Sequence, residues 1–169
     1  MTRFKTTAAL VLWTALTVSG SEVSTVSPTQ AFEKLKTPGT YLVDVRSIAE
    51  YYLVGHPVQA YSIPLTFWNE GLQDLERNEN FVRDLQARFR TTDVLVFICR
   101  SGGRSRKAAE EAQKAGFAEV YSVDEGFEGE KDEKGLRTVG GWRNRGLPST
   151  YDINPDLIYR GAKAKGDSR

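Results

Sequence analysis

Short apolar runs of strand length recur along the chain. The run Val94–Ile98 (VLVFI) is the most continuous of them outside the N-terminal region, and it is bounded by Asp93 and Cys99. Apolar runs of this length, bounded by charged or turn residues, are typical of strands that are buried on both faces in a parallel sheet. The other runs of this kind are residues 41–45 (YLVDV), 60–63 and 120–123.

Between these runs, apolar residues recur at helical spacing. Phe81, Leu85 and Phe89 lie four apart within residues 79–90, which predicts an amphipathic helix over this segment. The next helix is predicted by a narrower face of small residues, which Gly116 closes as a C-terminal stop. The members of that face are Ala108, Ala109, Ala112 and Ala115.

Two shorter helices are predicted from their start signals. Ser27 followed by Pro28 predicts a helix over residues 29–36, and Ser47 can cap a second helix that reaches Tyr52. Because strands alternate with helices, the pattern predicts an α/β domain with a mainly parallel sheet. In such domains, ligands bind beyond the carboxyl ends of the strands. Cys99 follows directly after an expected strand and therefore occupies such a position.

The N-terminal region has the pattern of an export signal. A short basic start is followed by an uncharged stretch at residues 6–21 with an apolar centre at residues 8–18, and small residues follow as far as Gly20. The apolar centre is shorter than the roughly 20 residues of a membrane-spanning helix. We therefore expect residues 1–20 to be a cleaved signal peptide that directs the protein to the periplasm, with no stable membrane insertion after cleavage. An uncleaved anchor and a plain terminal segment are the alternatives.

The remaining boundaries follow from the positions of the predicted elements. We expect a linker at residues 21–28, one domain at residues 29–149 with an insert at about 130–140, and a C-terminal tail at residues 150–169.

Composition excludes several classes of function. The 23 basic and 22 acidic residues nearly cancel and are scattered along the chain, so a nucleic-acid partner is not expected. With one cysteine and one histidine, the chain has no internal disulfide, no CxxC redox pair and no cysteine- or histidine-rich metal site. We expect neither a metal nor another cofactor.

The segment at residues 99–105 (CRSGGRS) carries the candidate chemistry. Gly102 and Gly103 permit backbone torsions that let successive N–H groups turn inward, and the N-terminus of the following helix adds its positive dipole end. Arg100 and Arg104 add two full charges. Such a cradle favours an anion, and a thiolate at Cys99 is itself an anion, so Cys99 is expected to be nucleophilic near neutral pH.

A structural interpretation of Cys99 stands beside this one. Most lone cysteines are small buried hydrophobic residues, and Cys99 follows an apolar strand. A strand-to-helix turn does not, however, need two glycines and two arginines for connection alone. The composition of the loop therefore favours a reactive thiol.

The chain resembles the single-domain rhodanese-like sulfurtransferases, of an exported type. Residues 99–105 are similar to the family's active-site loop, and residues 42–51 (LVDVRSIAEY) resemble its early DVR…E-[FY] segment. Residues 55–64 resemble its GHIPGAxxIP turn and strand. Gly126, Phe127, Trp142 and the Gly146–Pro148 run (GLP) match its closing GG…W…GLP pattern. The similarity covers about residues 29–148 in the order that the family has.

The resemblance implies a rhodanese-like fold, with a mainly parallel central sheet of about five strands flanked by helices on both faces. It also implies that Cys99 takes sulfane sulfur from thiosulfate, or a related small sulfur-containing anion, as a persulfide. A thiophilic acceptor, which is cyanide, a thiol or a protein, then receives the sulfur. The implied substrate-binding residues are Arg100, Ser101, Gly102, Gly103, Arg104 and Ser105. Arg100 and Arg104 are implied to orient the sulfonate end of the donor, and Arg104 also to pin the loop through a hydrogen bond to a carboxylate.

By the same resemblance, three charged residues support the loop from beneath. These are Asp44, Arg46 and Glu50, with Glu50 expected to pair with Arg46. A purely structural ion pair is an equal alternative for each of them. His56 lies in a Gly-His-Pro turn and is left out of the catalytic set, because the implied mechanism needs no histidine base.

The insert, Glu130–Gly140 (EKDEKGLRTVG), is a departure from the family pattern. It separates the Gly-Phe-Glu-Gly run from Trp142, which follows sooner in the family. It follows the last expected strand, so it is either a loop that reaches the mouth of the site and selects the acceptor or a tolerated surface loop.

Two alternative functions stand beside sulfur transfer. A phosphatase or arsenate reductase of related fold uses a Cys-x5-Arg loop, but only four residues separate Cys99 from Arg104. The shorter ring suits one sulfur atom better than a phosphate group. A non-catalytic module that senses sulfur or binds a partner is the other alternative, which the intact cysteine disfavours.

Overall fold

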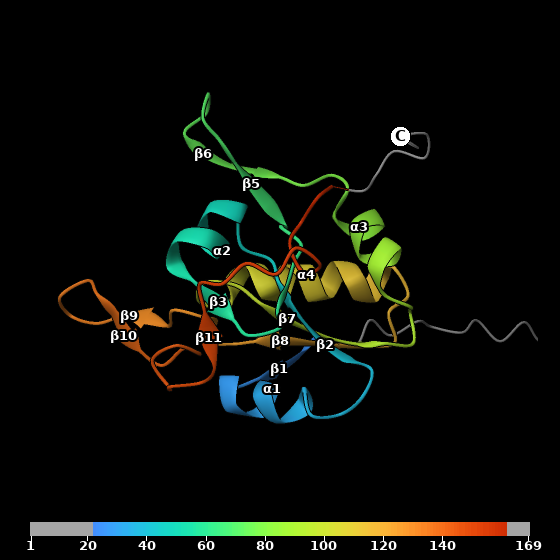
Figure 1. Ribbon diagram of the computed structural model, residues 1–169, viewed down its shortest axis with the longest axis horizontal. Coiled ribbons are helices and arrows are strands. Elements are labelled where there is room, and N and C mark those ends of the chain that lie inside the picture. The colour runs from blue at the N-terminus through green and yellow to red at the C-terminus, as the bar shows by residue number, and fades with distance from the viewer. Residues whose placement is uncertain (1–21, 162–169) are drawn as a thin grey trace, which may run out of the picture.

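The computed structural model describes residues 22–161 and contains a five-stranded sheet in which every pair of neighbouring strands is parallel (Figure 1). Its strand order is β1-β8-β7-β2-β4. The strands are β1 (Ser24–Val26), β2 (Thr40–Asp44), β4 (Tyr61–Ser62), β7 (Val94–Ile98) and β8 (Glu119–Val123). The predicted α/β class and the sheet of about five strands are confirmed.

Helices cover both faces of this sheet. α1 (Pro28–Lys34) lies on one side, and α3 (Phe81–Arg88) and α4 (Gly103–Lys114) lie on the other (Figure 1). The buried side chains of α2 (Ile48–Val54) join the cluster on the α1 side. The four helices correspond to the four that the sequence predicts, with ends that differ by a few residues.

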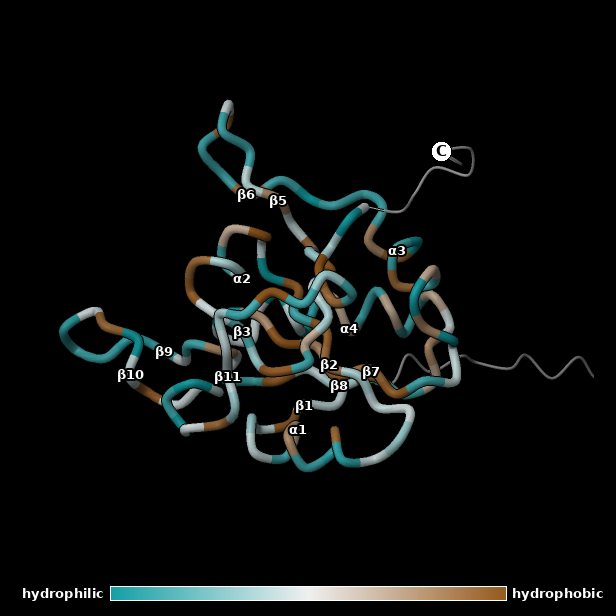
Figure 2. Tube along the Cα trace, in the orientation of Figure 1, coloured by the Kyte–Doolittle hydropathy of each residue, from teal (hydrophilic) through white to brown (hydrophobic). Residues whose placement is uncertain are grey.

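The central strand β7 explains why its sequence reads as one apolar run. Leu95 and Phe97 belong to the hydrophobic cluster that contains α3 and α4, whereas Val96 and Ile98 belong to the cluster that contains α1 and α2. Alternate side chains of a strand point to opposite faces, so a strand covered on both sides must be apolar at every position. Figure 2 shows hydrophobic segments gathered in the central strands of the molecule.

The segment expected to be a linker, residues 21–28, instead contains an edge strand. β1 pairs in parallel with β8, with Ser24 opposite Tyr121 and Val26 opposite Val123. Val23 and Val26 are buried. Three residues with two polar side chains give too short a pattern to predict a strand. The pairing arises only because β8 presents an open edge.

Three further strand pairs were not predicted. They are the β-hairpin of β5 (Thr66–Asn69) and β6 (Asp74–Arg77), the β-hairpin of β9 (Glu130–Lys131) and β10 (Arg137–Val139), and the pairing of β3 (His56–Pro57) with β11 (Ser149–Thr150). The β9–β10 hairpin is the expected insert. Both hairpins stand away from the body of the molecule (Figure 1). They bury little surface, so their sequences lack the apolar alternation from which strands are predicted.

The expected tail runs along the domain as far as residue 161. The backbone N–H of Ser62 on the edge strand β4 donates to the carbonyl of Leu157 at 2.8 Å, so this segment covers an edge that would otherwise expose unpaired backbone groups. The Tyr159 hydroxyl donates to the buried carboxylate of Asp84 at 2.8 Å. Burial and this bond raise the pKa of Tyr159 to about 12, so the phenol keeps the proton that it donates.

The expected signal peptide, residues 1–20, lies outside the described residues. Within residues 22–161, no helix has the length and apolar character needed to cross a bilayer.

Tyr159→Phe is expected to lower the free energy of unfolding by about 1–3 kcal/mol. The Asp84 carboxylate would lose the hydrogen-bond donor that Tyr159 supplies to Oδ2, and its other oxygen, Oδ1, already lacks a donor. Urea denaturation measures the change. The matched control is Tyr151→Phe, because Tyr151 is 64% exposed and removal of its hydroxyl is expected to have little effect. Equal losses in the two variants would contradict this role of Tyr159.

Candidate active site

The loop that begins at Cys99 lies at the carboxyl end of the central strand β7. Cys99 is 2% exposed, and its Sγ accepts a hydrogen bond from the backbone N–H of Gly102 at 3.2 Å. α4 begins at the next residue, Gly103. Its first N–H groups, those of Gly103, Arg104 and Ser105, have no acceptor within the helix. Free N–H groups and a positive dipole end therefore lie beside the sulfur, as the sequence predicts.

Gly102 is needed because of both its torsion and its surroundings. Its φ is +97°, and a Cβ at this position would lie 2.0 Å from the carbonyl oxygen of Asp124. The segment after β8 also pairs with the loop, since the N–H of Phe127 donates to the Cys99 carbonyl at 2.7 Å and that of Glu128 to the Arg100 carbonyl at 3.0 Å. The loop is thus clamped against residues 124–128, a contact that the sequence did not reveal.

Ser105 holds the loop from within. It is fully buried, and its hydroxyl donates to the Gly102 carbonyl at 2.8 Å and lies 3.5 Å from the sulfur of Cys99. The hydroxyl of Ser122 on β8 donates to Ser105 Oγ at 3.0 Å. Ser122 was not predicted, because only the parallel pairing of β7 with β8 brings it beneath the loop.

A pocket of about 310 Å³ opens over the loop. It is lined by Cys99, Arg100, Ser101, Gly103, Arg104 and Lys107. Among the described residues, Arg100 and Lys107 have no carboxylate partner, and both are exposed. Lys107 was missed in the sequence, although its position three residues after Arg104 on a predicted helix places the two on one face.

Arg104 is neutralised by Glu50. Its guanidinium binds the Glu50 carboxylate through two hydrogen bonds of 2.7 and 2.6 Å. Burial alone would raise the pKa of Glu50, but the hydrogen bonds and charge of Arg104, together with hydrogen bonds from Ser47, lower it to about 2. Ser47 is the N-cap of α2 and forms a capping box with Glu50. The Ser47 hydroxyl accepts from the Glu50 N–H, and the Glu50 carboxylate accepts from the Ser47 N–H. Arg104 therefore positions the loop and has little charge left for a substrate.

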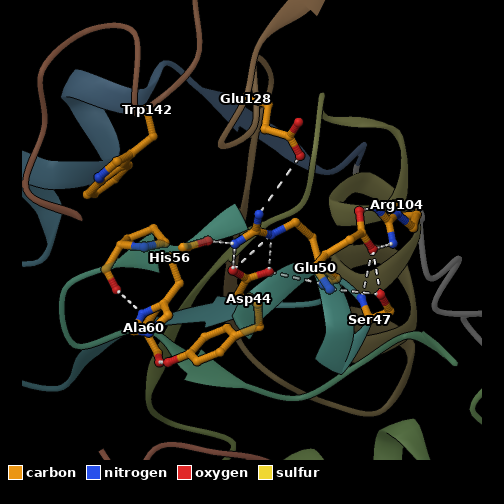
Figure 3. Close-up of polar contacts among 12 residues, drawn as sticks. Asp44, Ser47, Glu50, His56, Ala60, Arg104, Glu128 and Trp142 are labelled. Carbon is orange, nitrogen blue, oxygen red and sulfur yellow. Dashed lines mark hydrogen bonds and ion pairs between the residues drawn. The ribbon is translucent and has the colours of Figure 1, made fainter. Parts of the chain in front are cut away.

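The expected pairing of Glu50 with Arg46 is wrong. Arg46 is fully buried and binds Asp44, which is also fully buried, with 2.7 Å between Nη2 and Oδ2 (Figure 3). It also donates to the carbonyl of Gly55 at 2.7 Å. Ser47 begins α2 directly after Arg46, and Glu50 in the first turn of this helix reaches Arg104 on α4.

Glu128 connects this buried pair to the loop. Its Oε1 lies 3.9 Å from Arg46 Nη1 (Figure 3), and neither atom has a hydrogen-bond partner. The backbone N–H of Glu128 binds the Arg100 carbonyl. Glu128 thus connects Asp44 and Arg46 to the loop. The sequence did not reveal this role of Glu128, because the residue begins a dense run of mixed charge that is typical of a solvated loop.

His56 lies apart from this pocket. It is buried, stacks on Tyr51 with ring centroids 3.7 Å apart, and places Nδ1 3.1 Å from the Pro57 carbonyl. It is not among the residues that line the pocket. The β9–β10 hairpin contributes no lining residue either. One of the two interpretations of the insert requires it to reach the mouth of the site, and this pocket lining does not agree with it.

Comparisons with known proteins agree with this geometry. The profile of the Rhodanese-like domain family matches residues 27–133. The chain is 31% identical over 126 residues to thiosulfate sulfurtransferase 16, chloroplastic, from Arabidopsis thaliana, and the match covers 75% of this chain and 92% of that protein. An uncharacterized protein of Rickettsia prowazekii is 32% identical over 129 residues, covering 75% and 96% of the two chains.

The crystal structure of Rv0390 from M. tuberculosis is similar in fold. It superposes with a TM-score of 0.69 at 37% sequence identity, and the match covers 78% of this chain and all of that one.

Glu50→Gln is expected to destabilise the protein in a pH-dependent way. The folded-state pKa of about 2 lies below the ordinary value of 4.5, so the Glu50 carboxylate stabilises the fold above about pH 4.5 and loses this effect as the pH falls toward 2. The gap in unfolding free energy between wild type and variant should therefore be full at pH 7 and shrink below pH 4.5. Denaturant titrations at several pH values measure it.

The control for this variant is Glu33→Gln, because the Glu33–Lys36 ion pair is exposed and such pairs stabilise little. A Glu50→Gln gap that stays constant down to pH 2 would contradict the assignment.

Proposed function

The chain belongs to the rhodanese-like domain family, and we propose that it is a sulfurtransferase that carries sulfur on Cys99 as a persulfide. The observation that carries this proposal is the position of Cys99 Sγ, next to the N–H of Gly102 and the first N–H groups of α4. A thiolate and a terminal persulfide sulfur are both anions that this arrangement stabilises. The printed name of the Arabidopsis thaliana relative, a thiosulfate sulfurtransferase, supports the same activity.

The first half of the reaction loads the cysteine. The Cys99 thiolate attacks the outer sulfur of thiosulfate, a new S–S bond forms, and the S–S bond of the donor breaks so that its electron pair leaves with sulfite. Arg100 and Lys107, which have no carboxylate partner within residues 22–161, attract the donor and hold its sulfonate end. The N–H groups of the loop stabilise the terminal sulfur without proton transfer.

The second half of the reaction transfers the sulfur from Cys99 to an acceptor. A thiophilic acceptor, such as cyanide or a thiolate, attacks the terminal sulfur of the persulfide, and the electron pair of the breaking bond returns to Cys99 as a thiolate. Throughout both halves, Arg104 acts on the loop and not on the substrate, since Glu50 takes both of its bonding edges. Of the two roles that the resemblance implies for Arg104, we keep the hydrogen bond to a carboxylate that pins the loop and give up the orientation of the sulfonate.

The same contacts disfavour a phosphatase. Cys-x5-Arg enzymes hold the phosphate group with the arginine of the loop, whereas Arg104 follows four intervening residues after Cys99 and is paired with a carboxylate. A non-catalytic module remains the second candidate, and turnover of small substrates separates it from the enzyme.

We further propose that the protein is exported and that residues 1–20 are removed. The sequence pattern supports this, and cleavage near Gly20 would keep β1, which begins at Ser24 and is preceded by the buried Val23.

Wild-type protein is expected to form thiocyanate from thiosulfate and cyanide, and Cys99→Ser should abolish this reaction, because serine cannot form a persulfide. Intact-mass spectrometry after thiosulfate treatment should show one added sulfur atom in wild type and none in the variant. If wild type shows neither product, and instead hydrolyses a generic phosphate ester, the proposal fails.

N-terminal sequencing of protein recovered after expression of the full chain is expected to begin within a few residues of Ser21. Periplasmic and membrane fractions are collected separately. An intact Met1 in membrane-bound protein would support the uncleaved anchor.

A further inference from the structure

The β5–β6 hairpin carries an exposed apolar pair near the site. Trp68 is 54% exposed and Leu75 is 40% exposed, and the two residues are opposite each other in the register of the hairpin. We propose that the natural sulfur acceptor is a protein whose reactive thiol is surrounded by acidic and apolar residues, and that it docks on Trp68, Leu75, Arg100 and Lys107. This rests on the proposed sulfurtransferase function.

The β5–β6 hairpin begins near the carboxyl ends of the sheet strands, which is also where Cys99 lies. The N–H of Leu65, just before β5, donates to the carbonyl of Val45 just after β2 at 3.1 Å. The N–H of Asn78, just after β6, donates to the Leu65 carbonyl at 2.9 Å. Both ends of the hairpin are therefore anchored beside the carboxyl ends of the strands, and the hairpin projects from there (Figure 1).

The two faces of the hairpin differ in charge. Alternation along the strands places Trp68 and Leu75 on one face together with Thr66 and Arg77. The other face carries Phe67, Asn69, Asp74 and Glu76. The strand carboxylates Asp74 and Glu76 thus lie on the face opposite the apolar pair, and the cation on the apolar face, Arg77, is paired with Glu111 and Glu79.

The face with Trp68 and Leu75 is turned toward α4. Arg77 belongs to this face, and its Nη2 donates to the Glu111 carboxylate on α4 at 3.1 Å. Glu111 follows Lys107 by four residues, so the two side chains are neighbours on the helix, about 6 Å apart. Lys107 in turn lines the pocket over Cys99. The hairpin face and the pocket therefore border the same surface of α4.

The reach of this surface points to a macromolecular acceptor. Trp68 and Leu75 lie two residues beyond the Thr66–Arg77 pair, which is about 7 Å further along the hairpin. Neither residue is among those that line the pocket. Cyanide or a small thiol that occupies the pocket would not touch them, whereas a protein interface, which covers about 800 Å² on each partner, would.

The charges around the pocket favour an acidic partner protein. Within residues 22–161, the cations Arg100 and Lys107 that line the pocket have no ion pair, no carboxylate lines the pocket with them, and Glu50 is paired with Arg104. An acidic surface around the acceptor thiol would supply the missing partners, and Trp68 would be an aromatic anchor of the type that dominates binding energy at interfaces.

The test uses three acceptors with thiosulfate-loaded protein. The first is a twelve-residue peptide with a central cysteine flanked by glutamate and leucine, which can extend about 20 Å on each side of the thiol. The second is the same peptide with lysine in place of glutamate, and the third is cyanide. Wild type is expected to transfer sulfur to the acidic peptide with a kcat/KM about fivefold or more above that for the basic peptide.

Two double variants locate the docking surface. Trp68→Ser with Leu75→Ser should lower kcat/KM for the acidic peptide about tenfold and leave thiocyanate formation unchanged, which also shows that the variant is folded. The control is Leu136→Ser with Val139→Ser, which removes two exposed apolar residues, 59% and 54% exposed, from the other hairpin and should change neither rate. Lys107→Glu should reverse the preference between the two peptides.

Equal rates for the two peptides in wild type, or an unchanged kcat/KM for the acidic peptide in the Trp68→Ser, Leu75→Ser variant, would overturn the docking proposal while thiocyanate formation keeps the sulfurtransferase proposal intact. If wild type forms no thiocyanate, the proposed function fails, and the docking proposal fails with it.

Discussion

The ion pair between Glu50 and Arg104 is the contact on which the site depends. It joins α2 and α4, two helices whose buried side chains belong to different hydrophobic clusters, directly beside the loop of Cys99. Two hydrogen bonds in a partly buried position fix the direction of both side chains. The start of α4 is thereby held in place, next to Gly102, whose N–H donates to the sulfur. Because this pair uses up the charge of Arg104, the cations left for substrates are Arg100 and Lys107.

Beneath the loop, a second set of contacts makes the site rigid. The fully buried pair of Asp44 and Arg46 lies under the carboxyl edge of the sheet, and Glu128 connects it to the backbone of Arg100. Removing one member of a buried ion pair leaves an uncompensated charge, which destabilises proteins by about 3–5 kcal/mol. Such a base suits the proposed reaction, in which the loop binds a thiolate, a persulfide and a leaving sulfite in turn and contributes fixed dipoles and no moving proton.

In the docking proposal, the surface around the pocket adds selectivity for the acceptor. In the proposed reaction the donor anion and the later acceptor meet the same two cations, one after the other. Trp68 and Leu75 of the β5–β6 hairpin are not among the pocket-lining residues, so in this proposal they act on the second step and not on the first. The β9–β10 hairpin, which is the insert relative to the family pattern, contributes nothing to the pocket lining. It has no place in the proposed docking surface and therefore serves as a control for the β5–β6 hairpin.

The sequence by itself determined the class of the fold and singled out the loop at Cys99 as the candidate site. Local signals suffice for both: β7 is apolar at every position because both of its faces are buried, serines cap α1 and α2, and Gly102 and Gly103 mark the turn at Cys99. Only the tertiary structure decided which charges meet. Glu50 pairs with Arg104, 54 residues away, and not with Arg46, because the packing of helices on the sheet sets those distances. For the same reason, β1 became visible only beside the open edge of β8, and Ser122 and Glu128 only beneath the loop that they support.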